Sequence, residues 1–289
     1  MSNKILLLGA NGLIGYGITK YLFSKKVNLI AAVRTKKNKF SKNINFYYYN
    51  NLEKIKSFEN IEKIIKLSNP DFIINCAGIT KHIKKNNNKI LNIELPKFII
   101  KIKKKYKFRF IHITTDCVFD GKKGDYKESS ITNAKDIYGN SKAIADKFLI
   151  KSRNAIILRT STLGFEIKSK NGLLEWFLSK KKMCYGFKNA YFSGLTTLEL
   201  AKIIYKFVLK KQLIKRGLYN LSGPKINKFK LLNIIKDIYN KDIDILEENQ
   251  FRIDRSLNSN KFIKLTKYKK KSWKKMFLEY KKFHDKQFI

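Results

Sequence analysis

The sequence has little of several features that would point to particular classes of protein. Of its 289 residues, only three are cysteine and three are proline. Cys76, Cys117 and Cys184 are too scattered for a disulfide framework or for a zinc site, which needs closely spaced ligand pairs. No apolar run approaches the roughly 18 residues of a membrane span, and the first apolar stretch is too short for a secretory signal. We therefore expect a cytoplasmic protein with no bound metal and no membrane contact.

Acidic residues are scarce as well: 22 stand against 63 basic residues, for a formal net charge of +41. Such an excess usually indicates a nucleic-acid or anionic-membrane partner. Only seven of the basic residues are arginine, the side chain suited to bidentate phosphate and base contacts, and the 56 lysines are spread along the chain. The abundance of Lys, Asn, Ile, Tyr and Phe, all with A/T-rich codons, explains the charge by genome composition. We expect no nucleic-acid partner and rank nucleic-acid binding last.

With 44% apolar residues the chain can bury a sizeable core. Short apolar runs alternate with amphipathic stretches, which is typical of a parallel sheet covered by helices. Strands are expected at Ile5–Leu8, Leu29–Val33, Phe46–Tyr49, Phe72–Asn75, Phe108–Thr114 and Ala155–Arg159. Helices are expected at Leu13–Phe23, Ile55–Leu67, Asn88–Lys104, Ala134–Lys151, Leu173–Lys180, Thr197–Lys210 and Lys228–Tyr239. The order predicts an α/β fold with a doubly wound parallel sheet.

Beyond about Ser161 the pattern changes, and loops are expected around Gly164–Gly172, Gly186–Gly194 and Gly217–Pro224. We expect a dinucleotide-binding domain at residues 1–160. A smaller substrate lobe at residues 161–289 should be partly interleaved with the main sheet.

The first expected strand runs directly into a glycine-rich turn. Three glycines spaced three apart let a strand turn tightly into a helix, so that backbone N–H groups at the helix N-terminus face a pyrophosphate. Glycine triplets also occur in ordinary turns, so the motif alone is weak. It predicts a Rossmann-type cofactor site at Gly9, Asn11, Gly12, Leu13, Ile14 and Gly15.

Two later strand ends bear on the choice of cofactor. The second strand leads into Arg34, where a fold that selects NAD commonly has Asp or Glu. A planar guanidinium suits a 2′-phosphate instead, which favours NADPH over NADH, the alternative being a surface Arg without nucleotide contact. The fourth strand ends in Cys76, Ala77 and Gly78, whose small side chains allow close approach of adenine and ribose, although such residues are also ordinary turn chemistry.

The fifth strand leads into Thr115 and Asp116, and the next helix carries Tyr138 and Lys142, four apart and therefore on one helix face. With the glycine turn, these segments resemble the extended short-chain dehydrogenase/reductases, and within them the dTDP-4-dehydrorhamnose reductases. The resemblance runs from residue 1 to about residue 205. It is carried by Thr-Thr-Asp-x-Val-Phe-Asp-Gly from residue 114, Tyr-Gly-x-Ser-Lys from residue 138 and Leu-Arg-Thr-Ser from residue 158.

The resemblance implies an oxidoreductase acting on CH–OH groups, which reduces the keto group of a nucleotide-linked deoxysugar for surface-polysaccharide synthesis. Tyr138 would donate the proton to the developing alkoxide, and Thr115 would hydrogen-bond the same oxygen. Lys142 would bind the nicotinamide ribose and bring the pKa of the phenol, ordinarily about 10, toward working pH. Without the resemblance, Thr115 is a strand-end cap and Lys142 one of many surface lysines.

Substrate contacts are expected at Thr80, Asp116 and Thr162. Two departures from the reductase pattern leave the identity of the sugar and of the nucleotide base undetermined. Thr162 comes after Ser161, where the reductases commonly have an aromatic residue, and Thr80 precedes a basic run rather than acidic residues. Cys117 stands where 4,6-dehydratases carry the Glu that supplies acid–base chemistry, which favours reduction over dehydration. An epimerase of the same fold and a non-catalytic NADP-binding module remain alternatives, and a homodimer is left open.

Overall fold

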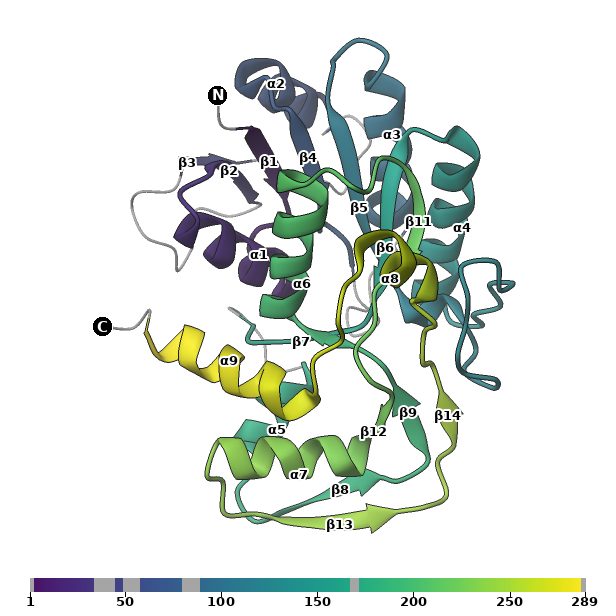
Figure 1. The fold of residues 1–289 in the computed structure, drawn as a ribbon. Coiled ribbons are helices and arrows are strands. Elements are labelled where there is room, and N and C mark those ends of the chain that lie inside the picture. The colour runs from purple at the N-terminus through teal and green to yellow at the C-terminus, as the bar shows by residue number, and fades with distance from the viewer. Residues whose placement is uncertain (1–2, 34–44, 49–57, 80–88, 167–171, 287–289) are drawn as a thin grey trace.

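The chain was analysed as a computed structural model that describes residues 3–33, 45–48, 58–79, 89–166 and 172–286 (Figure 1). Its centre is a seven-stranded sheet in the order β11-β6-β5-β4-β1-β2-β3, in which every neighbouring pair is parallel. The strands are β1 (Lys4–Leu8), β2 (Asn28–Val33), β3 (Asn45–Tyr48), β4 (Phe72–Asn75), β5 (Arg109–Thr115), β6 (Ala155–Thr160) and β11 (Gly217–Asn220). The expected doubly wound parallel sheet is confirmed.

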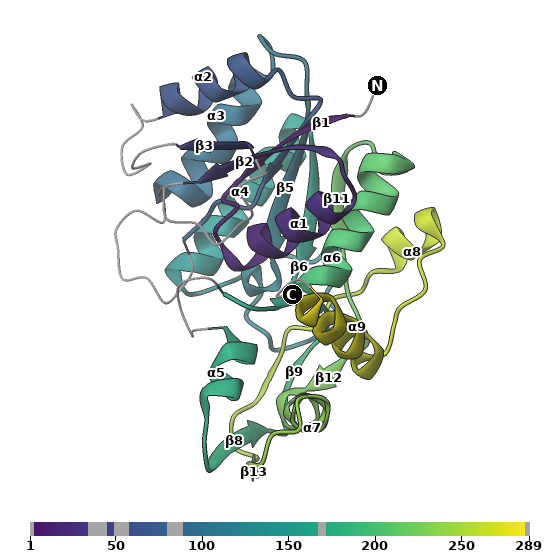
Figure 2. The same ribbon diagram turned by 90° about the vertical axis from the view of Figure 1, so that its left-hand side faces the viewer.

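Helices cover both faces of the sheet, with α2, α3 and α4 on one face and α1 and α6 on the other (Figure 2). Their bounds are α1 (Leu13–Ser24), α2 (Phe58–Ser68), α3 (Leu95–Ile102), α4 (Ile137–Ser152) and α6 (Thr197–Ile203). A π-helical turn, Ile90–Glu94, leads into α3, and another, Ile204–Lys210, follows α6. Because strand side chains alternate, Ile73 and Ile74 of β4 enter the separate cores of the two faces.

A second group of elements lies beyond the carboxyl ends of the strands, at the bottom of Figure 1. Its helices are α5 (Leu173–Ser179), α7 (Lys228–Ile238) and α9 (Trp273–Asp285). Its short strands are β7 (Thr162–Leu163), β8 (Met183–Phe187), β9 (Ala190–Phe192), β10 (Leu195–Thr196), β12 (Ile226–Asn227), β13 (Asp244–Glu248) and β14 (Ile253–Asp254). Helix α9 packs against both α7 and α6, which ties this group to the helical layer of the sheet. Helix α8 (Asn260–Thr266) lies instead against β11, at the edge of the main sheet. The division into domains at residue 160 stays a prediction.

Two of the stretches expected to be loops contain strands instead. Residues Gly217–Asn220 form β11, the edge strand of the main sheet, and β8 and β9 occupy much of the Gly186–Gly194 region. Turn residues conceal β11 in the sequence, because its first residue is Gly217, with φ of +99°, and Ser-Gly-Pro follows it closely. The strand also ends in a buried polar residue, Asn220, whose Nδ2 donates to the carbonyls of Tyr126 and Asn258.

Helix α4 begins at Ile137, three residues later than expected, because Asp136 caps it. The Asp136 carboxylate accepts a hydrogen bond from the N–H of Gly139 at 2.8 Å, which satisfies one of the free donors of the first turn. The cap fixes where the helix starts relative to β5 and therefore places Tyr138 in the first turn and Lys142 in the second.

Candidate active site

The strand ends that carry the predicted site residues lie side by side. In the sheet β1 is next to β4 and β4 is next to β5, with Leu8 opposite Asn75 and Asn75 opposite His112. Parallel strands end at the same edge of a sheet, so the glycine turn after β1, the Cys76 segment after β4 and Thr115 of β5 share one edge. The topology thus brings the predicted cofactor and catalytic segments together.

The glycine turn has the close contacts that its glycines predict. Gly9 has φ of +81°, and a Cβ there would lie 2.7 Å from the backbone nitrogen of Ala77. A Cβ on Gly15 would lie 2.2 Å from the carbonyl oxygen of Gly9. Only glycine fits these two positions, because the turn folds back onto the end of β4 and onto the first turn of α1.

The same turn has the features of an anion cradle. The N-cap residue of α1 is Gly12, which has no side chain to accept hydrogen bonds from the free N–H groups at the start of the helix. These groups include the N–H of Leu13 and of Ile14. The side-chain oxygen and nitrogen of Asn11 are buried and have no hydrogen-bond partner. Burying polar atoms without hydrogen-bond partners costs free energy, and a bound ligand would supply these partners. These residues fit the pyrophosphate of a dinucleotide.

The segment after β4 lies directly against that turn and consists of Cys76, Ala77 and Gly78. The Cys76 thiol is half-buried, and burial raises its pKa to about 12, against the opposing effect of the Lys142 charge. It is therefore an unreactive, neutral thiol near neutral pH. A Cβ on Gly78 would lie 2.9 Å from Oδ1 of Asn92, so small residues at this strand end leave room for neighbouring polar groups.

Thr115 and Tyr138 are in contact. The Thr115 hydroxyl lies near enough to the phenol to lower its pKa by hydrogen bonding, and it donates to Oδ1 of Asp116 at 3.1 Å and accepts from the N–H of Cys117 at 3.1 Å. Thr115 is therefore a cap of the short turn after β5 as well as a neighbour of the phenol. A hydroxyl has one proton, so the proton of Thr115 must leave Asp116 before it can serve a substrate oxygen.

Burial raises the pKa of the Tyr138 phenol above its ordinary value. Cys117, Asp116 and Asp136 add to this effect, and the hydrogen bond with Thr115 opposes it. The direction is opposite to the downward shift expected from Lys142, because burial of the phenol is the largest cause of the shift. Tyr138 consequently carries its proton at neutral pH.

Lys142 is 5% exposed, although lysine is rarely buried. Its Nζ donates to the carbonyl of Ile113 at 3.0 Å and lies 3.4 Å from Nε2 of His112. Burial lowers the pKa of Lys142 to about 8, while interactions with Asp146 and Cys76 oppose the shift. This lysine is part of the interior of the site rather than of the charged surface.

Asp116 is buried beside two cations from the C-terminal part of the chain. Burial raises its pKa, and the charges of Arg255 and Lys228 oppose the shift. Arg255 donates from Nε to the carbonyl of Phe119 at 3.0 Å and from Nη1 to the Cys117 sulfur at 3.5 Å. Lys228 has its Nζ 3.6 Å from the centre of the Phe192 ring. Residues of the C-terminal elements thus complete the surroundings of Asp116.

Of the remaining predicted residues, Thr162 is half-buried in β7, which pairs with β10 and does not touch the catalytic trio through any hydrogen bond among the described residues. Arg34 and Thr80 lie outside the residues that the structure describes. The role of Arg34 in cofactor preference and all three substrate contacts, at Thr80, Asp116 and Thr162, stay predictions.

Several residues of this region were not anticipated from sequence. Asn92 lies in the π-helical turn before α3 and is fully buried; its Nδ2 donates to Ser141, the neighbour of Lys142, and to the carbonyl of Ile79. The amphipathic pattern gave no signal for this kink. Arg255 and Lys228 lie more than 100 residues from Asp116 in sequence, and nothing in their local motifs marks them.

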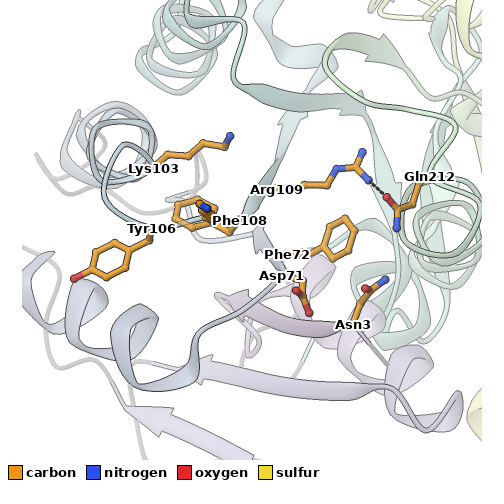
Figure 3. Close-up of a pocket in the computed structure, with 9 residues that line it drawn as sticks. Asn3, Asp71, Phe72, Lys103, Tyr106, Phe108, Arg109 and Gln212 are labelled. Atoms are coloured by element: carbon orange, nitrogen blue, oxygen red, sulfur yellow. Dashed lines mark hydrogen bonds between the residues drawn. The ribbon is translucent and has the colours of Figure 1, made fainter. Parts of the chain in front are cut away.

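A hollow of about 490 Å³ opens at the opposite edge of the sheet (Figure 3). It is lined by residues at the amino ends of strands, including Asp71 before β4 and Arg109 at the start of β5. Arg109 is held there by Gln212, which accepts from its Nη1 at 2.7 Å. The hollow is separate from the predicted site, because ligands of open parallel sheets bind at the carboxyl ends of the strands.

None of the described helices combines the length and apolar character that a membrane crossing requires. Within the described ranges, no three His, Cys, Asp or Glu side chains are arranged so that they could hold a metal ion.

Comparison with known proteins agrees with the geometry. The family model described as the RmlD substrate binding domain matches residues 3–185, more than half of the chain. This chain belongs to that family. A dTDP-4-dehydrorhamnose reductase of Aggregatibacter actinomycetemcomitans is 24% identical over 230 residues, which cover 76% of this chain and 73% of the relative. The family membership expected from the glycine turn and the residue 114 and 138 motifs is thereby confirmed.

Solved structures of similar fold cover nearly the whole chain. A hypothetical dTDP-4-dehydrorhamnose reductase from Sulfolobus tokodaii has a TM-score of 0.75 and 27% identity, covering 91% of this chain and 94% of that one. The dTDP-4-dehydrorhamnose reductase of Bacillus anthracis, determined in complex with NADP, has a TM-score of 0.77 and 18% identity, covering 97% and 99%. At this identity the second likeness shows the fold alone. Both agree with a Rossmann-type reductase architecture.

Proposed function

We propose that this protein is an NADPH-dependent reductase of a nucleotide-linked keto-deoxysugar, similar to dTDP-4-dehydrorhamnose reductase, and that it supplies surface-polysaccharide synthesis. The observation that carries the proposal is the contact between Thr115 and Tyr138 at the strand edge that holds the glycine turn. Family membership and the NADP complex of a structural relative support it. A bound NADPH would supply the hydride.

The chain's own residues would handle the proton. Tyr138 carries its proton at neutral pH and would donate it to the substrate oxygen as negative charge develops there. Thr115 would hold the same oxygen once its hydroxyl turns away from Asp116. With a pKa of about 8, Lys142 is mostly an ammonium at neutral pH and would stabilise the phenolate that remains and bind the nicotinamide ribose.

Asp116 would contact the sugar, with Arg255 and Lys228 balancing its charge. The Cys117 thiol is hydrogen-bonded to Arg255 and is no substitute for the carboxylate that elimination of water requires. Reduction without dehydration is the chemistry that this set of groups supports.

The test is a screen of dTDP- and UDP-linked keto sugars against purified protein, following the absorbance of the reduced nicotinamide. Stoichiometric oxidation of NADPH with formation of the hydroxy sugar supports the proposal. Interconversion of sugar epimers without net oxidation indicates an epimerase instead. Cofactor binding without turnover of any keto sugar indicates a binding module.

The role of the phenol is tested by Tyr138→Phe, which removes the acidic proton and retains the ring. We expect kcat/KM to fall by about 10²- to 10⁴-fold, the usual contribution of a positioned proton donor. Tyr185→Phe is the matched control, since Tyr185 is exposed on β8, and it should leave turnover unchanged. Undiminished turnover by Tyr138→Phe contradicts the assignment.

The preference for NADPH is tested at Arg34. Arg34→Ala removes the guanidinium proposed to bind the 2′-phosphate, so we expect KM for NADPH to rise while KM for NADH, which lacks that phosphate, stays the same. Equal changes for the two cofactors contradict this role of Arg34.

A further inference from the structure

A chain of buried hydrogen bonds runs from the floor of the cofactor site to Lys142. The N–H of Ala77 donates to Oδ1 of Asn75 at 3.0 Å, and Nδ2 of Asn75 lies 3.2 Å from Nδ1 of His112. Nε2 of His112 in turn lies 3.4 Å from Nζ of Lys142. Asn75 and His112 have no exposed surface, so no solvent can substitute for a missing partner.

Starting from Ala77, the donor and the acceptor of each hydrogen bond in this series can be assigned in turn. A backbone N–H only donates, so it fixes Oδ1 of Asn75 as the acceptor and turns Nδ2 toward His112. Nδ2 is a donor, which requires a lone pair on Nδ1 of His112. Burial and the Lys142 charge lower the pKa of His112 well below its ordinary value, so the ring is neutral and its one proton is on Nε2.

The Nε2 proton then points at Lys142. An uncharged amine can accept this proton with its lone pair and still donate to the carbonyl of Ile113. An ammonium has three protons and no lone pair, so it meets Nε2–H donor to donor. The hydrogen-bond pattern therefore matches the uncharged form of Lys142.

We infer that His112, held by Asn75 as the Nε2–H tautomer, is a positioning residue that favours the uncharged amine of Lys142 and so lowers the pH at which the site loses its ammonium. The inference rests on the proposed function, in which that ammonium stabilises the Tyr138 phenolate. Protonation of Lys142 in this arrangement sets the ammonium against Nε2–H, donor to donor, and this conflict is relieved only if the ring proton moves to Nδ1 and the Asn75 amide reverses, which breaks the bond from Ala77. The charge of the catalytic lysine and a backbone N–H beside the cofactor are thus coupled.

Other groups around Lys142 act in both directions. Burial is the largest cause of its lowered pKa, while Asp146 on the same helix and Cys76 after β4 oppose it. Asp146 is itself paired with Arg159 of β6 at 3.1 Å, which reduces its effect on the lysine. His112 of β5 acts in the same direction as burial, and it does so through a contact that a substitution can remove.

The direct test is the tautomer of His112, read from long-range ¹H–¹⁵N NMR spectra of the wild-type protein. The chain has only three histidines, His82, His112 and His284, so the ring signals are few, and the one missing in His112→Gln is assigned to His112. We expect the Nε2–H tautomer, without titration near the ordinary pKa of about 6.5. An Nδ1–H tautomer, or a ring that titrates in this range, overturns the inference whether or not any sugar is turned over.

The second test is the pH dependence of kcat/KM. In Asn75→Asp the carboxylate accepts from Nδ1–H, which reverses the tautomer and presents a lone pair to the lysine. The decrease of kcat/KM at high pH, which is the basic limb of the profile, should then begin about one pH unit or more higher. His112→Gln should also shift this limb to higher pH. His284→Gln is the matched control, because Nδ1 of His284 lies at the same 3.4 Å from Nζ of Lys20 outside the site, and its limb should not move. An unshifted limb in both Asn75→Asp and His112→Gln overturns the inference.

Discussion

Arg159 of β6 and Asp146 of α4 form an ion pair that is closed off from solvent: Nη2 and Oδ2 are 3.1 Å apart, and each side chain is 1% exposed. The guanidinium also lies over the Phe119 ring, 5.0 Å from its centre. Burial raises the pKa of Asp146 in spite of this partner, so each charge depends on the other to remain in the interior.

Arg159→Met should therefore destabilise the protein by about 3–5 kcal/mol, because it leaves the Asp146 carboxylate buried without its partner. Urea unfolding followed by circular dichroism measures this. The double variant Asp146→Leu/Arg159→Met should recover most of the loss. Lys188→Met is the control: it breaks the exposed 2.7 Å pair with Glu247 and should cost less than about 1 kcal/mol. Equal costs for the two single variants would show that burial of the pair has no effect.

Gly15→Ala should weaken both the fold and the cofactor site. The new Cβ would lie 2.2 Å from the carbonyl oxygen of Gly9, a backbone atom that can move only if the turn shifts. A Cβ on Gly12 would lie 3.4 Å from the same atom, and Gly12 has φ of −78°. We expect thermal unfolding without cofactor at a lower temperature for Gly15→Ala and near the wild-type value for Gly12→Ala. A similar decrease in both variants would refute this steric difference.

The rate should fall above about pH 8 as Lys142 loses its proton, since the pKa of its ammonium is about 8. A pH profile of kcat/KM shows this as a basic limb, decreasing up to tenfold per pH unit. In Lys142→Arg the guanidinium stays charged throughout this range, so whatever activity remains should have no such limb. A limb that persists in Lys142→Arg would belong to a different group.

Lys142→Met should stabilise the protein at neutral pH by about 1–3 kcal/mol while abolishing turnover, because it removes the cost of burying an ammonium. The sign follows from the lowered pKa: the folded state disfavours the charged form, and the cost is fully present below pH 8. It disappears as the pH rises toward the ordinary value of 10.5. Urea unfolding at several pH values should show the advantage of the variant shrinking between these limits, and an advantage independent of pH would contradict the account.

The sheet and most of its helices could be predicted because each is encoded in one contiguous stretch. The glycine turn, Thr115 and the Tyr138–Lys142 pair are also local motifs, and parallel topology then brings their strand ends together. Strand β11 could not be found in this way, since its buried Asn220 depends on carbonyls from Tyr126 and Asn258, far away in sequence.

The pKa shifts in the site were harder to predict than the residues that form it. The Lys142 charge was expected to bring the pKa of the phenol down, whereas burial of Tyr138 raises it. Burial and the contact between His112 and Lys142 are products of packing between β5 and α4, which no spacing rule describes. The cations beside Asp116 come from residues 228 and 255 and are likewise visible only once the chain is folded.

The position of β11 also bears on how the chain is made. During translation β6 leaves the ribosome some 60 residues before β11, which covers its outer edge, so the backbone N–H and C=O groups on that edge stay open to other nascent chains until Gly217–Asn220 arrives. A polypeptide halted at residue 160 would keep that unprotected edge permanently and should accumulate as insoluble material rather than as a working coenzyme-binding half.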